Sequence, residues 1–235
     1  MEETKLQVWL QQEGEESYRT FTQKLIPGLG FCYGVRMPKL RVKAKAIARA
    51  NGLAYLTEVW KNPPQALSHE EKLLAARVLG AAKTAMSERV AALKELLPYV
   101  DNWAVCDCLA SSFPVKTAED HQEVWAFLRP YWDSPAVYDR RAAAVFALSH
   151  FLKEEWLDEV LAAYGQVPTE EYYVSMAVAW GVSMAFVAFP AKTKQWLLTG
   201  PLERGTLRRT YQKIMESRQV SQQDRDWIQK MKQEG

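Results

Sequence analysis

The sequence predicts an all-α protein, built as a curved solenoid of antiparallel helix pairs of the HEAT-like or ARM-like kind. Apolar residues recur at helical spacing almost everywhere, and no convincing series of alternating strands is present. Ser68, Thr117 and Ser221 each have an acidic residue three positions later, which is typical of a capped helix start. Short connections favour antiparallel neighbours, and a long succession of such pairs favours a solenoid over a four-helix bundle.

Each expected helix is placed between such signals. Pro38 and Pro135 suit the first turn of a helix, where the missing N–H costs nothing. Asp101 is expected to cap the helix that follows it. The segment from Tyr172 to Pro190 has no charged residue, and its Ala, Ser and Gly content predicts a helix enclosed by neighbours rather than a membrane span. In order, helices are expected over residues 17–26, 38–50, 53–61, 68–84, 87–97, 101–112, 117–129, 135–151, 154–163, 169–188, 191–199, 205–217 and 221–232.

The chain is expected to form one domain over residues 17–235, preceded by an acidic N-terminal lead-in over residues 1–16. Its 235 residues, 48% of them hydrophobic, can bury a substantial core without disulfides or metals. No low-complexity tract or Gly/Ser linker divides it. The lead-in is expected to be either mobile or a short extra helix.

The sequence indicates a cytoplasmic protein, and a monomer is expected. Its acidic start, Met1-Glu2-Glu3, lacks the apolar run of a secretory signal. No Cys/His spacing suits zinc, so no metal site is expected. Reduced, buried thiols are expected at Cys32, Cys106 and Cys108. Surface or packing roles are expected for His69, His121 and His150, and packing roles for Trp9, Trp60, Trp125, Trp132, Trp156, Trp196 and Trp227.

Charge is balanced in total but not along the chain. The formal net charge of +2 does not imply a general polyanion-binding protein. Between Gly34 and Thr57, however, there are basic residues and no acidic one: Arg36, Lys39, Arg41, Lys43, Lys45 and Arg49. A second basic run contains Lys192, Lys194, Arg204, Arg208, Arg209, Lys213 and Arg218. Such runs suit phosphate neutralisation on a nucleic acid, although a solvated helix face has the same composition.

An indole and a carboxylate share one predicted helix face. Trp103 and Asp107 are four residues apart, so their side chains project from the same side of the helix. Apolar residues and two thiols surround Asp107 in the sequence, and such surroundings make an unpaired carboxylate costly. Two interpretations therefore stay open: a buried tether to Arg140 or Arg141 of another helix, or a carboxylate retained for chemistry.

Three segments resemble, in order and spacing, the AlkD-like family of DNA alkylation repair proteins. They are residues 102–107 (NWAVCD), 140–146 (RRAAAVF) and 176–180 (MAVAW). Residues 34–38 and 207–214 resemble the entrance to the family's early basic helix and its late basic helix, so the likeness covers roughly residues 18–218.

The resemblance implies a HEAT-like solenoid that binds double-stranded DNA on a basic concave face. It also implies a monofunctional glycosylase that releases positively charged N3- or N7-alkylated purines, without a metal or an organic cofactor. Asp107 corresponds to the catalytic carboxylate, Trp103 and Trp180 to aromatic walls of the cleft, and Arg141 to a phosphate contact. Contacts to the DNA backbone are expected from Arg36, Lys39, Lys43, Arg208, Arg209 and Lys213.

The helix that carries Trp180 departs from this family pattern. Active members commonly have basic residues around this tryptophan, whereas this chain has Ser175, Met176 and Ser183. Two further hypotheses therefore stand beside the glycosylase: a non-catalytic protein of the same fold that recognises bent, branched or damaged DNA by shape, and a protein-binding helical scaffold.

Overall fold

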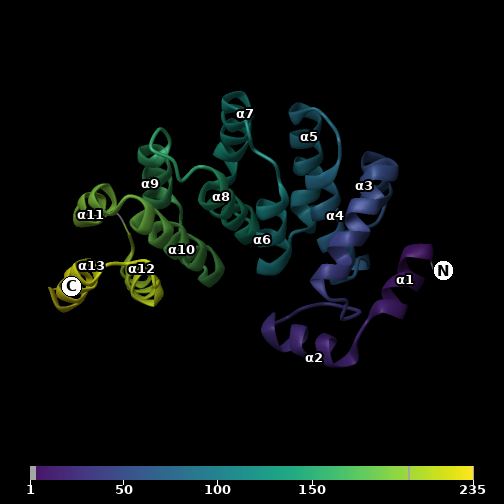
Figure 1. The fold of residues 1–235 in the computed structure, drawn as a ribbon, viewed down its shortest axis with the longest axis horizontal. Helices are drawn as coiled ribbons and strands as arrows, with labels where there is room; N and C mark the ends of the chain where they lie inside the picture. The colour runs from purple at the N-terminus through teal and green to yellow at the C-terminus, as the bar shows by residue number, and fades with distance from the viewer. Residues whose placement is uncertain (1–3, 201, 235) are drawn as a thin grey trace. The chain divides into compact units, whose positions relative to one another are not determined.

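The structure is a computed structural model that describes residues 4–200 and 202–234. Every regular element in these ranges is helical, which confirms the predicted all-α class (Figure 1). The helices form two compact units, Met1–Val124 and Trp125–Gly235. The curved solenoid and the domain boundary expected at residue 17 stay predictions.

Helix α4 (His69–Ala81) is the centre of the first unit. Both α3 (Met37–Trp60) and α6 (Trp103–Ser112) pack against it (Figure 1). Most residues of α4 are buried, among them Leu74 and Leu79, so this helix forms much of the core between its two neighbours. The unit also contains α1 (Lys5–Glu13), α2 (Glu16–Leu25) and α5 (Met86–Leu96), and the division between the units falls within α7 (Ala118–Leu128).

Several helices begin where the capping pattern predicts. Ser68 Oγ accepts a hydrogen bond from the N–H of Glu71, and the Glu71 carboxylate accepts one from the N–H of Ser68 at 2.8 Å. Thr117 and Asp120 exchange the same pair of bonds at the start of α7. These side chains satisfy N–H groups that have no partner inside the helix.

The N-terminal lead-in contains a short helix, one of the two alternatives that the sequence predicts for it. Helix α1 begins with a capping box in which Thr4 and Gln7 exchange hydrogen bonds at 3.0 and 3.2 Å. Leu10 of this helix is fully buried. The helical alternative is therefore correct for Lys5–Glu13, whereas residues 1–3 lie outside the described residues.

Three expectations about helix ends need correction or refinement. The helices expected over 38–50 and 53–61 are joined as α3, with a kink at Asn51, whose φ of −168° and ψ of 84° are not helical. Asp101 does not cap α6, because Asn102 does. Pro135 lies before the N-cap of α8 (Val137–His150), not in its first turn, whereas Pro38 lies in the first turn of α3 as expected.

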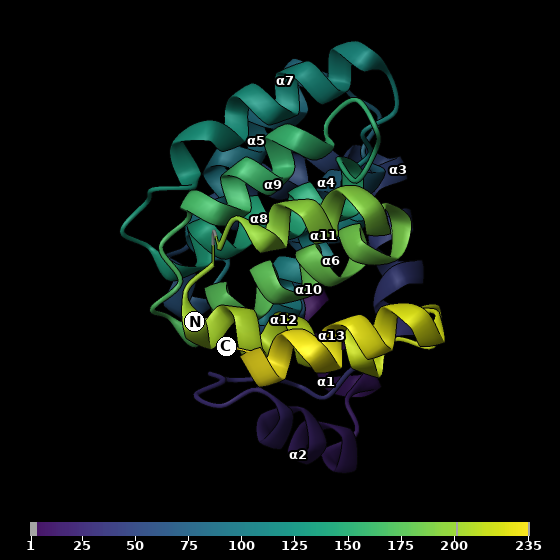
Figure 2. The same cartoon turned by 90° about the vertical axis from the view of Figure 1, so that its left-hand side faces the viewer.

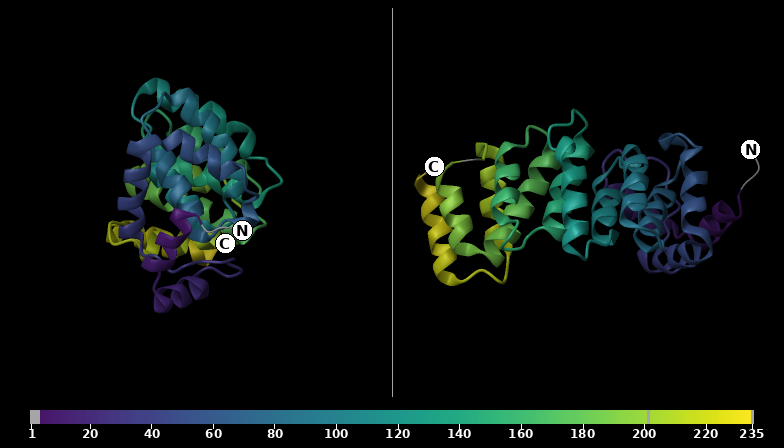
Figure 3. Two further views of the ribbon diagram at one scale, coloured as in Figure 1. Left: turned by 90° about the vertical axis from the view of Figure 1, so that its right-hand side faces the viewer. Right: turned by 90° about the horizontal axis from the view of Figure 1, so that it is seen from above.

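Helix α10 (Tyr172–Ala188) is the centre of the second unit. It packs against α8, α9 (Leu157–Gln166), α11 (Pro190–Leu198) and α12 (Arg204–Glu216), and α13 (Gln222–Glu234) packs against α12. Figure 2 shows α12 beside both α10 and α13, and Figure 3 shows the helices of this unit standing next to one another.

The centre of the second unit depends on a close contact at Gly181. A Cβ at this position would lie 2.2 Å from Oη of Tyr164, a fully buried residue of α9. The Tyr164 hydroxyl donates a hydrogen bond to the carbonyl of Ala144 in α8 at 3.0 Å. Burial raises the pKa of this phenol, so it stays protonated and donates. One side chain thus joins three helices.

Packing expectations for the other aromatic and titratable residues are largely met. Trp125 contacts Trp132, Phe151 and Trp156, with ring centroids 4.9 to 6.1 Å apart. All three cysteines are buried, as predicted. His69 and His121 are also buried. Within the described ranges, no helix is both long and apolar enough to cross a membrane.

Candidate functional site

The partly exposed side of α6 carries the indole and the carboxylate singled out in the sequence. Trp103, Asp107 and Ser111 follow one another at four-residue spacing, and each retains some exposure to solvent. Val105 and Leu109, which project from the other side of the helix, are fully buried. The structure therefore confirms that Trp103 and Asp107 share one face, and it adds a hydroxyl one turn further along.

The first turn of α6 is held by hydrogen bonds from two directions. Oδ1 of Asn102 accepts hydrogen bonds from the N–H groups of Ala104 at 3.0 Å and Val105 at 3.1 Å. Asp101 pairs with the ammonium of Lys72, a buried side chain of α4. Asp101 also accepts a hydrogen bond from Nδ2 of Asn102 at 2.8 Å. These contacts fix the start of the helix that carries Asp107.

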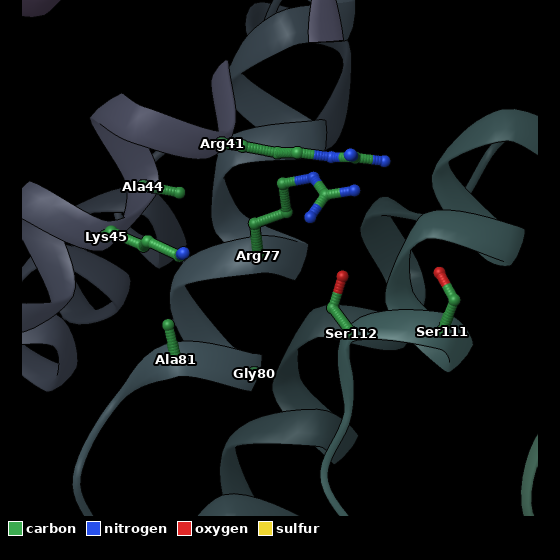
Figure 4. A pocket seen from close by; sticks show the side chains of 8 residues that line it. All are labelled: Arg41, Ala44, Lys45, Arg77, Gly80, Ala81, Ser111 and Ser112. Carbon is green, nitrogen blue, oxygen red and sulfur yellow. The ribbon is translucent and has the colours of Figure 1, made fainter. Parts of the chain in front are cut away.

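A pocket of about 470 Å³ opens beside this helix (Figure 4). Its walls come from α3, α4 and α6, and its lining residues are Arg41, Ala44, Lys45, Arg77, Gly80, Ala81, Ser111 and Ser112. Figure 4 shows the guanidinium groups of Arg41 and Arg77 one above the other, with the hydroxyl of Ser112 pointing toward them from below. Ser111 therefore belongs both to the exposed side of α6 and to the pocket wall.

Charges on these helices act on a common neighbour, the Cys108 thiol. Burial raises the pKa of Cys108, and the negative charge of Asp107 adds to this effect. The positive charges of Arg77 and Arg41 lower the same pKa. The three charged groups thus lie within electrostatic reach of one buried sulfur atom.

The loop before α3 is anchored by one buried carboxylate, Glu70 of α4. This side chain is 2% exposed and accepts hydrogen bonds from the backbone N–H groups of Tyr33, Gly34 and Val35 at 2.8 to 3.1 Å. Gly34 has a φ of 82°, a conformation that favours glycine. These bonds set where the basic helix α3 begins.

The basic residues at the start of α3 contact the two N-terminal helices and the turn between them. Arg36 pairs with Glu15 at 2.8 Å, and Lys39 pairs with Glu13 at 2.9 Å. The ammonium of Lys43 lies over the ring of Trp9, 4.7 Å from its centroid. All three predicted DNA-backbone residues of this run therefore already have partners within the chain.

Trp180 and Arg141 belong to the second unit. Trp180, on α10, is 38% exposed, which leaves much of its ring accessible. Arg141, on α8, is 5% exposed, and its Nη1 donates a hydrogen bond to the carbonyl of Tyr173 at 2.7 Å. Arg140 is also buried and donates to the carbonyl of Ser134.

The uncharged residues around Trp180 have structural partners. Ser183 donates to the carbonyl of Trp180 at 2.7 Å. Ser175 lies 2.7 Å from the hydroxyl of Thr206, and Nη1 of Arg209 donates to Ser175 at 3.1 Å. Both serines are buried and uncharged; Ser175 joins α10 to α12, whereas the bond of Ser183 lies within α10.

The predicted backbone contacts on α12 differ in their surroundings. Arg208 is exposed. The guanidinium of Arg209 lies 5.3 Å from the centroid of Tyr172, an exposed aromatic side chain. Lys213 pairs with Glu216 at 2.9 Å. Arg208 is thus the most accessible of the three cations.

Comparison with known protein families shows which family this chain belongs to. The profile of the family described as DNA alkylation repair enzyme matches residues 6–183, more than half of the chain. The chain belongs to this DNA alkylation repair enzyme family. The AlkD-like resemblance is thereby confirmed, and the matched range contains Trp103, Asp107 and Trp180. No curated protein and no solved structure matches the chain.

Within this family member, sequence reasoning did not find Arg77 or Ser112. Arg77 is 36 residues from Arg41, and only the packing of α3 against α4 brings the two cations together. Gly80 of α4 lies so close to Ser112 of α6 that a Cβ at position 80 would be 2.2 Å from the carbonyl oxygen of Ser112. Glycine therefore permits the close approach of the two helices that brings Ser112 to the pocket. The signal available in the sequence was the four-residue spacing of Arg41 and Lys45, which places both on one side of α3.

No group of three or more His, Cys, Asp or Glu side chains that could hold a metal ion occurs among the described residues.

Proposed function

We propose that the protein is a monofunctional DNA N-glycosylase that releases cationic N3- or N7-alkylated purines from double-stranded DNA. The observation that carries this proposal is the partly exposed carboxylate of Asp107, one helical turn from Trp103, within the range matched by the repair family. Family membership alone would not assign the reaction, because one fold can serve several functions.

The chemistry requires little beyond a well-placed negative charge. The bond between C1′ of the deoxyribose and the purine nitrogen breaks, and its electron pair goes to the base, which leaves as a neutral molecule. Water adds its oxygen to C1′ and loses a proton to solvent. Asp107 stabilises the oxocarbenium-like sugar that develops between these events and orients the water.

Aromatic side chains complement this carboxylate. The electron-rich face of Trp103 packs against the deoxyribose and stabilises its developing positive charge. The family resemblance gives Trp180 a similar role and Arg141 a phosphate contact, and we propose that both act on the DNA from the second unit. Arg141 is buried and donates to the carbonyl of Tyr173. A DNA phosphate would therefore contact this side chain after a small rearrangement or through a bridging water.

Release of free base tests this function. Purified protein is incubated with a duplex that contains a single 7-methylguanine, and the released base is quantified by mass spectrometry. The unmodified duplex and a reaction without protein serve as controls. We expect release from the alkylated duplex well above spontaneous depurination; release at the spontaneous rate would contradict the glycosylase proposal.

A second candidate is a catalytically silent protein that binds branched, bent or damaged DNA. The observation that favours it is the absence of a charged side chain among Ser175, Met176 and Ser183 around Trp180. This candidate predicts strongly salt-dependent DNA binding without base release. The same incubation, followed by a binding titration, separates the two candidates.

A further inference from the structure

The side-chain amide of Asn102 uses its whole hydrogen-bonding capacity at the junction of two helices. Its Oδ1 accepts hydrogen bonds from the N–H groups of Ala104 and Val105 in α6. Its Nδ2 donates to Oδ1 of Asp101 at 2.8 Å and lies 3.4 Å from Nδ1 of His69 in α4. Since a side-chain amide has two N–H donors and one oxygen with two lone pairs, each of these has a partner here. The buried amide thus links the start of α6 to α4.

The orientation of this amide depends on Asp101. A carboxylate can only accept hydrogen bonds, so it selects the orientation in which Nδ2 faces Asp101 and Oδ1 faces α6. In the reverse orientation, oxygen would face oxygen and N–H groups would face N–H groups, which removes the cap of the helix. The side chain of Asp101 is 49% exposed, however, and water competes for a carboxylate in such a position. A second contact is needed to keep it beside Asn102.

Lys72 of α4 makes that second contact. Its ammonium pairs with Oδ2 of Asp101, and only 7% of the lysine side chain is exposed. The pair spans the packing of α4 against α6 (Figure 1). Replacement of a buried ion pair by apolar residues often costs no stability, so such a pair suits the fixing of a geometry better than the strengthening of a fold.

We propose that Lys72 is a positioning residue for the release of the base. Its ammonium holds Asp101, this carboxylate orients the amide of Asn102, and the amide closes the first turn of α6. Trp103 is the first residue of this helix, and Asp107 follows one turn later. Without the ammonium, the indole and the carboxylate meet the deoxyribose in a wider range of orientations. The inference rests on the proposed function, in which Asp107 acts on the sugar.

The central variant for a test is Lys72→Met, which removes the ammonium and keeps a flexible apolar chain in the buried position. Lys72→Gln, which retains an N–H donor without the charge, is the second variant. Lys61→Met is the matched control, because it removes the ammonium of another ion pair of the same unit, the pair with Glu58. Circular dichroism and thermal midpoints establish which variants are folded.

Single-turnover release of 7-methylguanine is measured at saturating protein, and duplex affinity is measured separately by fluorescence anisotropy. Lys72→Met is expected to slow release by about ten- to 100-fold, because small misplacements of reacting groups have effects of this size. Its duplex affinity should be nearly unchanged, Lys72→Gln should be intermediate in rate, and Lys61→Met should behave as the unsubstituted protein does. An unchanged rate in folded Lys72→Met and Lys72→Gln would overturn the proposal. Weaker DNA binding with a normal rate at saturation would also overturn it.

The series of contacts predicts that losses along it do not multiply. Lys72→Met and Asn102→Ala interrupt the same connection, so the double variant should release the base no more slowly than Asn102→Ala alone. Rate losses that multiply in the double variant would show that Lys72 acts independently of Asn102, and would overturn the series.

Amide hydrogen exchange separates this inference from the proposed function, because it needs neither DNA nor activity. Peptides that contain the first turn of α6 should exchange faster in Lys72→Met than in the unsubstituted protein or Lys61→Met, since this turn is then less firmly closed. Unchanged exchange in folded Lys72→Met would overturn positioning by Lys72, whatever the activity. Absence of base release by the unsubstituted protein would overturn the proposed function and the role of Lys72 in it, even where faster exchange shows that Lys72 holds α6.

Discussion

Asn102 accepts a hydrogen bond from the backbone N–H of Val105 at 3.1 Å and so closes the first turn of the helix that carries Asp107. Substitution by alanine removes Oδ1, the atom that accepts the hydrogen bonds from both Ala104 and Val105. We expect Asn102→Ala to lower the free energy of unfolding by about 1 kcal/mol. Urea denaturation measures the change, and Asn102→Ser, which keeps a capping oxygen, should lose less. Equal losses in both variants would contradict the capping role.

Gly181 and Tyr164 provide a test of the packing in the second unit. A methyl group at position 181 would lie 2.2 Å from the buried phenol oxygen, so α9 or α10 must shift. We expect Gly181→Ala to lower the free energy of unfolding by about 1 to 3 kcal/mol. Gly30→Ala is the control, since a Cβ there has no neighbour within 4 Å. A stable Gly181→Ala variant would contradict the close contact.

His69 should make stability fall on the acid side of neutrality. Burial lowers the pKa of His69 from its ordinary value of 6.5, and the charge of Lys72 lowers it further, against the opposing effect of Glu70 and Asp101. As the pH falls below about 6.5, the unfolded chain binds a proton that the folded chain does not, so the folded state loses relative stability.

The measurement is the thermal midpoint at about pH 7.5 and pH 5.5. This window lies above the range in which exposed carboxylates titrate. We expect the midpoint to fall in the unsubstituted protein and to fall less in His69→Gln. His150→Gln, a change at a less buried histidine, should behave as the unsubstituted protein does. An identical decline in all three would exclude His69 as the cause.

Much of the fold could be predicted because its signals are local. Capping residues and helical periodicity placed most helices, and even the interruption between the two halves of α3 was predicted beside Asn51. Helix α1 carries a capping signal of the same kind, Thr4 followed by Gln7. The cap expected at Asp101 is wrong by one residue, because the helix begins at Trp103 and Asn102 precedes it; Asp101 pairs with Lys72 of another helix instead.

The candidate site could be predicted only in part. Trp103 and Asp107 share a face because of their spacing in one helix, which sequence alone contains. Arg77 joins Arg41 only when α3 packs on α4, and no local pattern encodes that neighbour. Likewise, the basic run of α3 does not reveal which cations pair with Glu13 and Glu15 and which stay unpaired.

The most direct test of the account is the rate of base release by Asp107→Asn. Single-turnover release of 7-methylguanine from duplex DNA is measured for the unsubstituted protein, for Asp107→Asn and for Asp133→Asn, a change at an exposed carboxylate elsewhere. We predict a loss of about 100-fold or more in Asp107→Asn alone, with duplex binding nearly intact. Equal release by all three proteins would contradict the role of Asp107.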